Sequence, residues 1–121
     1  MRMNEIGYEG PPPIDSYGGG GFRIAGAFHA GDLMIAGDRP AVWSAGDLGV
    51  DAFSAVSNRT SELDVLLVGM GEEIAPLPGP TRAALEGAGV GVEVMSTASA
   101  CRTYNVLLAE NRRVAVALIA V

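Results

Sequence analysis

Residues 91–121 read GVEVMSTASACRTYNVLLAENRRVAVALIAV, and this stretch decides the fold. It begins with a short apolar strand, 92–95, and then passes through Ser96 and Thr97. A helix-forming run without Gly or Pro follows over 98–110. The stretch closes on eight apolar residues, VAVALIAV, at 114–121. The pattern predicts one strand–helix–strand unit.

The predicted helix has recognisable ends and one apolar face. Thr97 is the expected N-cap, because a hydroxyl can accept a hydrogen bond from a first-turn amide. Asn111 is expected to end the helix, since Asn tolerates the left-handed conformation of a C-cap. At helical spacing the apolar positions gather on one side: Ala100, Cys101, Tyr104, Leu107 and Leu108.

The run 114–121 has no polar residue on either face. A strand of this kind is covered on both faces, as in the interior of an α/β sheet. It is too short to cross a bilayer as a helix, which takes about 20 residues. We therefore predict a fully buried interior strand and no stable membrane insertion.

The first half of the chain favours short β-strands. Strands are expected at 14–17, 22–28, 33–35 and 41–43, with 22–28 and 33–35 forming a hairpin whose turn contains His29. The four glycines at 18–21 are read as a bulge or tight crossing beside a strand, with a phosphate-binding nest as the alternative. Trp43 is expected to anchor the core, and 48–56 is a weaker helix candidate.

From residue 63 onward the predicted order is strand, helix, strand, helix, strand. The strand 63–69 (LDVLLVG) precedes a proline-rich loop and a short helix at 81–87. This alternation predicts an α/β domain with a mixed central sheet flanked by helices, plus a small N-terminal β-layer. Residues 1–13, with three consecutive prolines, are expected to be a flexible lead-in, and 14–121 a single domain.

Composition limits the function. The chain has 121 residues and a net charge of −6, which does not favour nucleic acid as a partner. Its one cysteine, Cys101, cannot form an internal disulfide, and residues 1–13 have no apolar signal segment, so we expect a cytoplasmic protein. With His29 and Cys101 in different elements, no standard zinc site can be assembled. No cofactor and no metal are predicted.

Several segments together resemble a known family. They are IDSYGGGGFRIAG, LDVLLVGMGEE and VEVMSTASACRTYNVLLAENRRVAVALIAV, with the Trp43 segment between them. They are similar to a small α/β family of unknown molecular function that includes an adipogenesis-associated domain protein. It also includes the third assembly factor of the mitochondrial NADH:ubiquinone oxidoreductase alpha subcomplex. The resemblance implies a single α/β domain and contacts with proteins rather than an established reaction.

Two loops could form a ligand site. Gly69 and Gly71 follow one predicted strand, and Thr97 follows another; ligands of open α/β sheets bind beyond the carboxyl ends of strands. If the strands are parallel neighbours, these loops meet, and amides at the start of the helix would favour an anion. A dinucleotide is not expected, because Ile74 stands where the third glycine of the fingerprint would be.

The C-terminal helix adds Arg102, Thr103 and Asn105 as binding candidates. Arg102 is expected near the 69–73 loop, either in an ion pair with a nearby glutamate (Glu72, Glu73 or Glu93) or free to hold a carboxylate or phosphate. Cys101 is expected to be a buried core residue without a histidine to act as its base. No catalytic residue is predicted.

The sequence thus favours a non-enzymatic protein-interaction or assembly-factor-like function with an unknown protein partner. The alternative is a small-molecule, anion-binding protein or an enzyme that uses a cleft between Gly69–Gly71 and the start of the C-terminal helix. A broad apolar patch would favour the first function, and a pocket at these residues the second. Self-association into a homodimer is left open.

Overall fold

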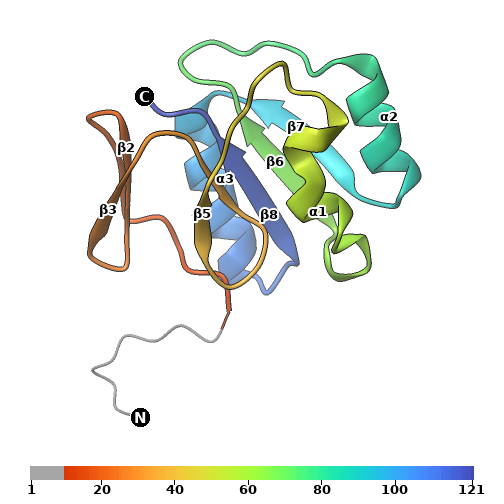
Figure 1. The fold of residues 1–121 in the computed structure, drawn as a ribbon. Coiled ribbons are helices and arrows are strands. Elements are labelled where there is room, and N and C mark those ends of the chain that lie inside the picture. The colour runs from red at the N-terminus through yellow and green to blue at the C-terminus, as the bar shows by residue number, and fades with distance from the viewer. Residues whose placement is uncertain (1–9) are drawn as a thin grey trace.

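A five-stranded sheet lies between two covering layers in the computed structural model, which describes residues 10–121 (Figure 1). Its strand order is β5-β4-β8-β6-β7. The strands are β4 (Leu33–Ile35), β5 (Pro40–Val42), β6 (Val65–Gly69), β7 (Gly91–Met95) and β8 (Val114–Leu118). The helices are α1 (Ser54–Ser57), α2 (Gly79–Gly87) and α3 (Thr97–Ala109), with short 3-10 turns at Val50–Phe53 and Thr60–Glu62.

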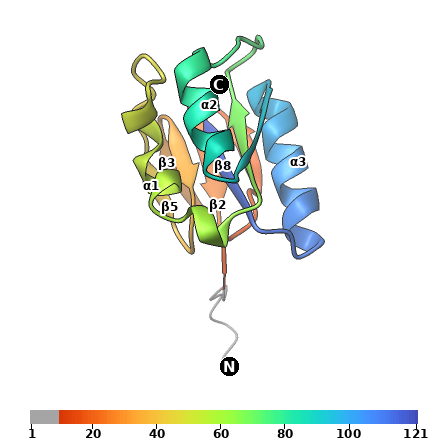
Figure 2. The same cartoon turned by 90° about the vertical axis from the view of Figure 1, so that its right-hand side faces the viewer.

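The sheet is mixed, as predicted. β6, β7 and β8 are parallel, whereas β4 runs antiparallel to β8 and β5 antiparallel to β4. The crossover through α2 steps from β6 outward to β7, and the crossover through α3 steps back across β6 to β8. Since parallel crossovers are right-handed, opposite steps require opposite faces. Figure 2 shows α1 and α2 on one face and α3 on the other.

The strand β8 is buried along its whole length. Its five residues pair with β4 on one side and β6 on the other, and each is at most 3% exposed. Large and small side chains alternate: Val116 belongs to the apolar cluster under α3, and Ala115 and Ala117 to the cluster under α1 and α2. The prediction of an interior strand is confirmed for 114–118. Residues 119–121 lie beyond the strand and are only half-buried, so the predicted span was too long.

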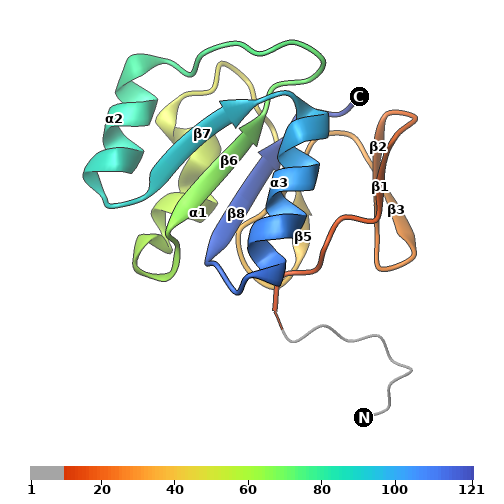
Figure 3. The same cartoon turned by 180° about the vertical axis from the view of Figure 1, so that it is seen from behind.

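The additional β-layer exists, but its pairing differs from the prediction. β1 (Ser16–Gly18), β2 (Gly21–Ile24) and β3 (Ala27–Ala30) form a separate antiparallel sheet beside α3 (Figure 3). The predicted hairpin between 22–28 and 33–35 is wrong, because the chain already turns at Ala25 and Gly26, both at positive φ. β4 joins the central sheet instead. His29 consequently lies inside β3 and not in a turn.

The start of α3 also corrects a prediction. Ser96 is the N-cap, and its side chain accepts a hydrogen bond from the amide of Ser99 at 3.2 Å. Thr97 is the first helical residue, and its hydroxyl bonds to Gly71 and Ile119 instead of capping the helix. At the other end Asn111 has φ 63° and lies just beyond the helix, as predicted. The amide of Arg112 then bonds to the carbonyl of Leu107 at 3.0 Å, which completes a Schellman-type ending.

Trp43 anchors the core on the α1 side. Its indole N–H donates to the carbonyl of Ala52 at 2.7 Å, and its ring lies 5.5 Å from that of Phe53. The helix predicted at 48–56 is a 3-10 turn followed by the single turn of α1, and Leu48 before it has φ 60°. No helix in residues 10–121 is long and apolar enough to cross a bilayer.

Replacing Leu118 with Asp should unfold the domain. Leu118 is fully buried, and an unpaired buried charge costs several kcal/mol or more, a large part of a total stability of about 5–15 kcal/mol. Val106→Asp on the exposed side of α3 is the control, since Val106 is 55% exposed and should tolerate the charge. Thermal unfolding followed by circular dichroism measures both. An L118D protein that melts like V106D would contradict this placement.

Candidate functional site

The loops after β6 and β7 meet at the carboxyl end of the sheet, as predicted for Gly69, Gly71 and Thr97. β6 and β7 are parallel neighbours with Gly69 opposite Met95. The amide of Gly71 donates to the Thr97 hydroxyl at 2.9 Å, and the Gly71 carbonyl accepts from the Thr97 amide at 2.8 Å. The Thr97 hydroxyl donates in turn to the carbonyl of Ile119 at 2.7 Å. One buried threonine therefore joins three chain segments.

The two glycines are needed for this close approach. A Cβ on Gly69 would lie 2.9 Å from the Cα of Thr97, so a side chain there would push α3 off the sheet. Gly71 has φ 90°, a conformation that side chains disfavour. The glycines thus have a packing and a conformational role inside the chain itself.

Two of the amides expected to favour an anion bond to other groups of the protein. The Thr97 amide bonds to Gly71, and the Ser99 amide bonds to the Ser96 side chain, so these two first-turn donors are already engaged. Glu72 and Glu73 are exposed on the same loop and would repel an anion. The arrangement stabilises the junction of β6, α3 and the segment after β8.

Asn105 and Tyr104 hold the segment before β1. The Asn105 side chain accepts from the Ile14 amide and donates to the Ile14 carbonyl, both at 2.8 Å, as a neighbouring strand would. The Tyr104 hydroxyl donates to the carbonyl of Pro12 at 2.8 Å, and burial raises the pKa of Tyr104. Pro12, within the predicted lead-in, is therefore bonded to α3, whereas residues 1–9 fall outside the described residues.

Arg102 and Thr103 remain outside these networks. Arg102 is exposed on α3, and within residues 10–121 no carboxylate lies within ion-pair distance of it. The ion pair expected with Glu72, Glu73 or Glu93 is therefore absent. Thr103 is half-buried, and its side chain has no hydrogen bond to another described residue. The other four predicted binding residues take part in hydrogen bonds or close packing within the described part of the chain: Gly69, Gly71, Thr97 and Asn105.

Cys101 lies in the core beside Tyr104. It is 3% exposed, and burial raises the pKa of its thiol to about 12, against the smaller opposing effect of the Arg102 charge. The native thiol is therefore neutral at physiological pH. The placement confirms Cys101 as a core residue.

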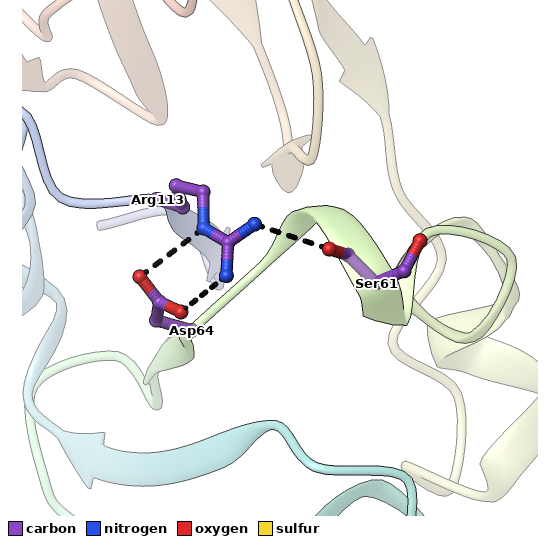
Figure 4. A network of polar contacts seen from close by, with 3 residues as sticks. All are labelled: Ser61, Asp64 and Arg113. Atoms are coloured by element: carbon purple, nitrogen blue, oxygen red, sulfur yellow. Dashed lines mark hydrogen bonds and ion pairs between the residues drawn. The ribbon is translucent and has the colours of Figure 1, made fainter.

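A bidentate ion pair fastens the opposite end of the sheet. Arg113, just before β8, bonds through two nitrogens to the carboxylate of Asp64, just before β6, at 2.7 and 3.3 Å (Figure 4). A third nitrogen donates to the carbonyl of Ser61 at 3.1 Å. The Arg113 hydrogen bond lowers the pKa of Asp64, so the pair stays ionised at neutral pH. Sequence analysis did not single out either residue.

The glycine run 18–21 forms the turn between β1 and β2 and contacts the end of the chain. Gly18, Gly19 and Gly20 all have positive φ, which explains why glycine occupies these positions. The Gly20 amide donates to the carbonyl of Val121 at 2.8 Å. The run is therefore a hairpin turn and not the bulge or tight crossing expected. The hydrogen bond of Gly20 joins this turn to Val121.

A cleft that sequence analysis missed lies between β5 and α1. Its volume is about 700 Å³, and its lining includes Trp43, three carboxylates and two arginines: Asp38, Asp51, Glu62, Arg39 and Arg59. Arg59 lies 3.5 Å from Glu62 in an ion pair. The sequence feature that could have indicated this cleft is the charged turn 37–40, which precedes an edge strand. Within the described residues no three His, Cys, Asp or Glu side chains gather as a metal site would require.

Comparison with known proteins identifies the family. The model of a protein family of unknown function, DUF498/DUF598, matches residues 14–119. The chain belongs to this family. An uncharacterised protein of Rhodobacter capsulatus is 48% identical over 119 residues, which are 98% of this chain and 93% of that protein.

Other relatives of the chain are named for a cellular role. NADH dehydrogenase (ubiquinone) 1 alpha subcomplex assembly factor 3 of Homo sapiens is 32% identical over 109 residues. The match covers 88% of this chain and 59% of the human protein. The matched part of this chain therefore spans about three fifths of that assembly factor.

Solved structures share the fold. A crystal structure described as an outer membrane protein from Bartonella henselae has a TM-score of 0.84 at 37% identity, over 91% of this chain and 95% of that one. A solution structure from Rhodopseudomonas palustris has a TM-score of 0.80 at 35% identity, over 99% and 93% of the two chains. These two solved proteins thus share the fold of this chain over most of its length.

Thr97→Val should destabilise the protein more than Thr97→Ser. Valine keeps the shape but leaves the Gly71 amide and the Ile119 carbonyl without their partner, at a cost of roughly 1–3 kcal/mol. Serine keeps the hydroxyl and loses only a methyl group, at about 1 kcal/mol. Urea denaturation measures both free energies of unfolding. A T97V protein as stable as T97S would show that the bridge is not needed.

Cys101→Ala should cost only about 1 kcal/mol and leave the fold intact. In the native wild type a thiol reagent should react slowly at pH 8 and rapidly after denaturation. Because the folded pKa of about 12 lies above the ordinary 9.0, the thiol's contribution to stability is complete below pH 9.0 and is lost as pH rises toward 12. C101A should lack this part of the alkaline loss. Rapid labelling of the native protein would contradict burial.

Proposed function

We propose that this chain is a non-enzymatic, assembly-factor-like protein that binds other polypeptides. The observation that carries the proposal is the kinship with assembly factor 3 over 88% of the chain. Since the match covers only 59% of the human protein, the proposal extends to the shared domain and not to the partners of that protein. Binding to a polypeptide is the function that the shared domain supports best.

The geometry of the strand ends supports binding over catalysis. Gly69, Gly71 and Thr97 are bonded or packed among themselves, and the Cys101 thiol is buried and neutral. A reactive thiol would need a lowered pKa and access to solvent. These groups serve the fold, which leaves the outer surfaces for recognition. A cytoplasmic location and a homodimer stay predictions.

Arg102 is the candidate through which an anionic group of the partner could be held. It is exposed on α3 near Val106, which is 55% exposed, so charge and apolar surface lie side by side on the helix. The guanidinium suits a carboxylate or phosphate, whether on a protein or on a small molecule. The same residue therefore serves to test the protein-interaction proposal and the anion-binding alternative.

We expect the tagged full chain, expressed in its native cell, to retain a polypeptide at constant stoichiometry. Arg102→Ala should weaken this capture at low salt, with a free energy of unfolding within about 0.5 kcal/mol of wild type. Arg112→Ala is the matched control, since Arg112 is another exposed arginine just beyond the same helix. Mass spectrometry of the eluate identifies proteins and small molecules. A small molecule retained without any polypeptide would favour the alternative function.

A further inference from the structure

The two edges of the central sheet differ in whether a side chain bonds to their outward backbone groups. At the β7 edge the guanidinium of Arg82 donates to the carbonyl of Val92 at 3.0 Å and is held by Glu86 at 3.0 Å. A charged side chain over an edge discourages pairing with another strand. At the β5 edge no described residue bonds to the outward backbone groups. Within residues 10–121 the sheet has one guarded edge and one open edge.

The register shows which groups of β5 are open. The Trp43 amide donates to the carbonyl of Asp32 in the ladder with β4, at 3.2 Å. Backbone groups of an antiparallel strand alternate between its two sides, so the N–H and C=O of Val42 point away from β4. Pro40 has no N–H and offers only its carbonyl. Val42 is therefore the centre of the open edge, and its side chain is 89% exposed.

Hollows flank this edge on both faces of the sheet. On the α1 face lies the 700 Å³ cleft, and on the other face a hollow of about 290 Å³ next to the β2–β3 hairpin. The smaller hollow is lined mainly by apolar residues, among them Pro12, Ile24 and Pro40. Side chains of a strand point alternately to opposite faces. A strand added beside β5 would direct its side chains alternately toward the two hollows.

We propose that β5 is the docking site of an extended peptide segment of a partner protein, which adds to the sheet as a sixth strand. This proposal rests on the proposed function, because it names a surface for the polypeptide in addition to Arg102 on α3. Main-chain bonds to Val42 and Pro40 would give affinity, and alternate side chains would give selectivity. The residue opposite Val42 points to the face of the sheet that carries the apolar hollow, because Val42 pairs with Leu33 on that face, and its neighbours point to the face of the cleft.

The charge of the cleft defines the chemistry of the segment. Arg59 is paired with Glu62, so the other charged side chains of the lining are two carboxylates, Asp38 and Asp51, and one guanidinium, Arg39. The excess negative charge suits a long basic side chain of the partner. The segment is therefore extended, apolar on the face toward the hairpin and basic on the face toward α1.

A second copy of this chain fits the edge less well. Pairing β5 with β5 of another copy would present Ala41 and Trp43 toward the α1 face. Ala41 carries only a methyl group, and Trp43 is buried in its own core. The cleft would stay unfilled. The observations therefore favour a foreign peptide, and self-association becomes an outcome of the test.

Hydrogen exchange of the full chain, measured by NMR, tests whether the edge is open. The Val42 amide should exchange quickly in the free protein, and the amides of Ala41 and Trp43, which bond within the sheet, slowly. A slowly exchanging Val42 amide in the free protein, from self-association or from any other cover, would overturn the proposal.

Selection from a random library of linear peptides, each about 12 residues long, tests the occupant. The selected peptides should alternate apolar and basic residues and should protect the Val42 amide from exchange. Val42→Pro removes only the outward N–H, which Pro tolerates on an edge strand, and should weaken binding at least roughly tenfold. Val42→Thr keeps the N–H and should bind within about threefold of wild type.

Each failure has a separate meaning. If no peptide is selected, or if V42P binds as tightly as V42T, the edge is not the site. If V42P fails to fold, N-methylation of the peptide residue opposite Val42 removes a bond from the other side and should weaken binding equally. If cells retain a polypeptide on wild type and on V42P alike, the proposed function stands and the β5 site is rejected. Loss of polypeptide from wild type itself rejects both.

Discussion

The double-sided burial of β8 is the constraint on which the rest of the structure depends. The strand has Val116 on one face and Ala115 and Ala117 on the other, so both of its faces are apolar. Both faces must be covered by other elements, because an apolar face left in water would lose the favourable free energy of burial. The small alanines face α1 and α2, where Trp43 and Phe53 supply the volume. The larger side chains face α3 and the separate hairpin sheet. The three-layer arrangement follows from this requirement.

The two ends of the β6–β8 pair are each fixed by a polar contact, and this affects where function can lie. Thr97 closes the carboxyl end through Gly71 and Ile119, and Arg113 with Asp64 closes the amino end. The buried contact is the more important for stability, because its groups have no water to replace the lost bonds, whereas the ion pair is half-exposed and screened. Because Gly71 and Thr97 bond within the chain, the proposed recognition uses the outer surfaces instead.

The proposed binding role draws on the relatives named as assembly factors and on the open edge of the sheet. An open strand edge offers unpaired backbone groups to which an extended chain can bond. Arg82 protects the β7 edge against the same kind of pairing. Pro40 limits the β5 edge to the neighbourhood of Val42, which restricts the partner to a short segment and reduces uncontrolled aggregation.

The sequence alone determined the elements whose signals are local. The apolar run 114–118 had to be interior, because no face of it is polar, and Asn111 had to follow the helix, because Asn tolerates the left-handed conformation found there. Only the tertiary structure decided which distant groups meet. The hydrogen-bond partners of Thr97 and Asn105 lie far away in sequence. Residues 22–35 could pair in more than one way, because the alternation of apolar and polar residues indicates which face of a strand is buried but not which strand lies beside it. The β5 edge and its cleft were likewise undecided, because an open edge is defined by the strands that do not cover it.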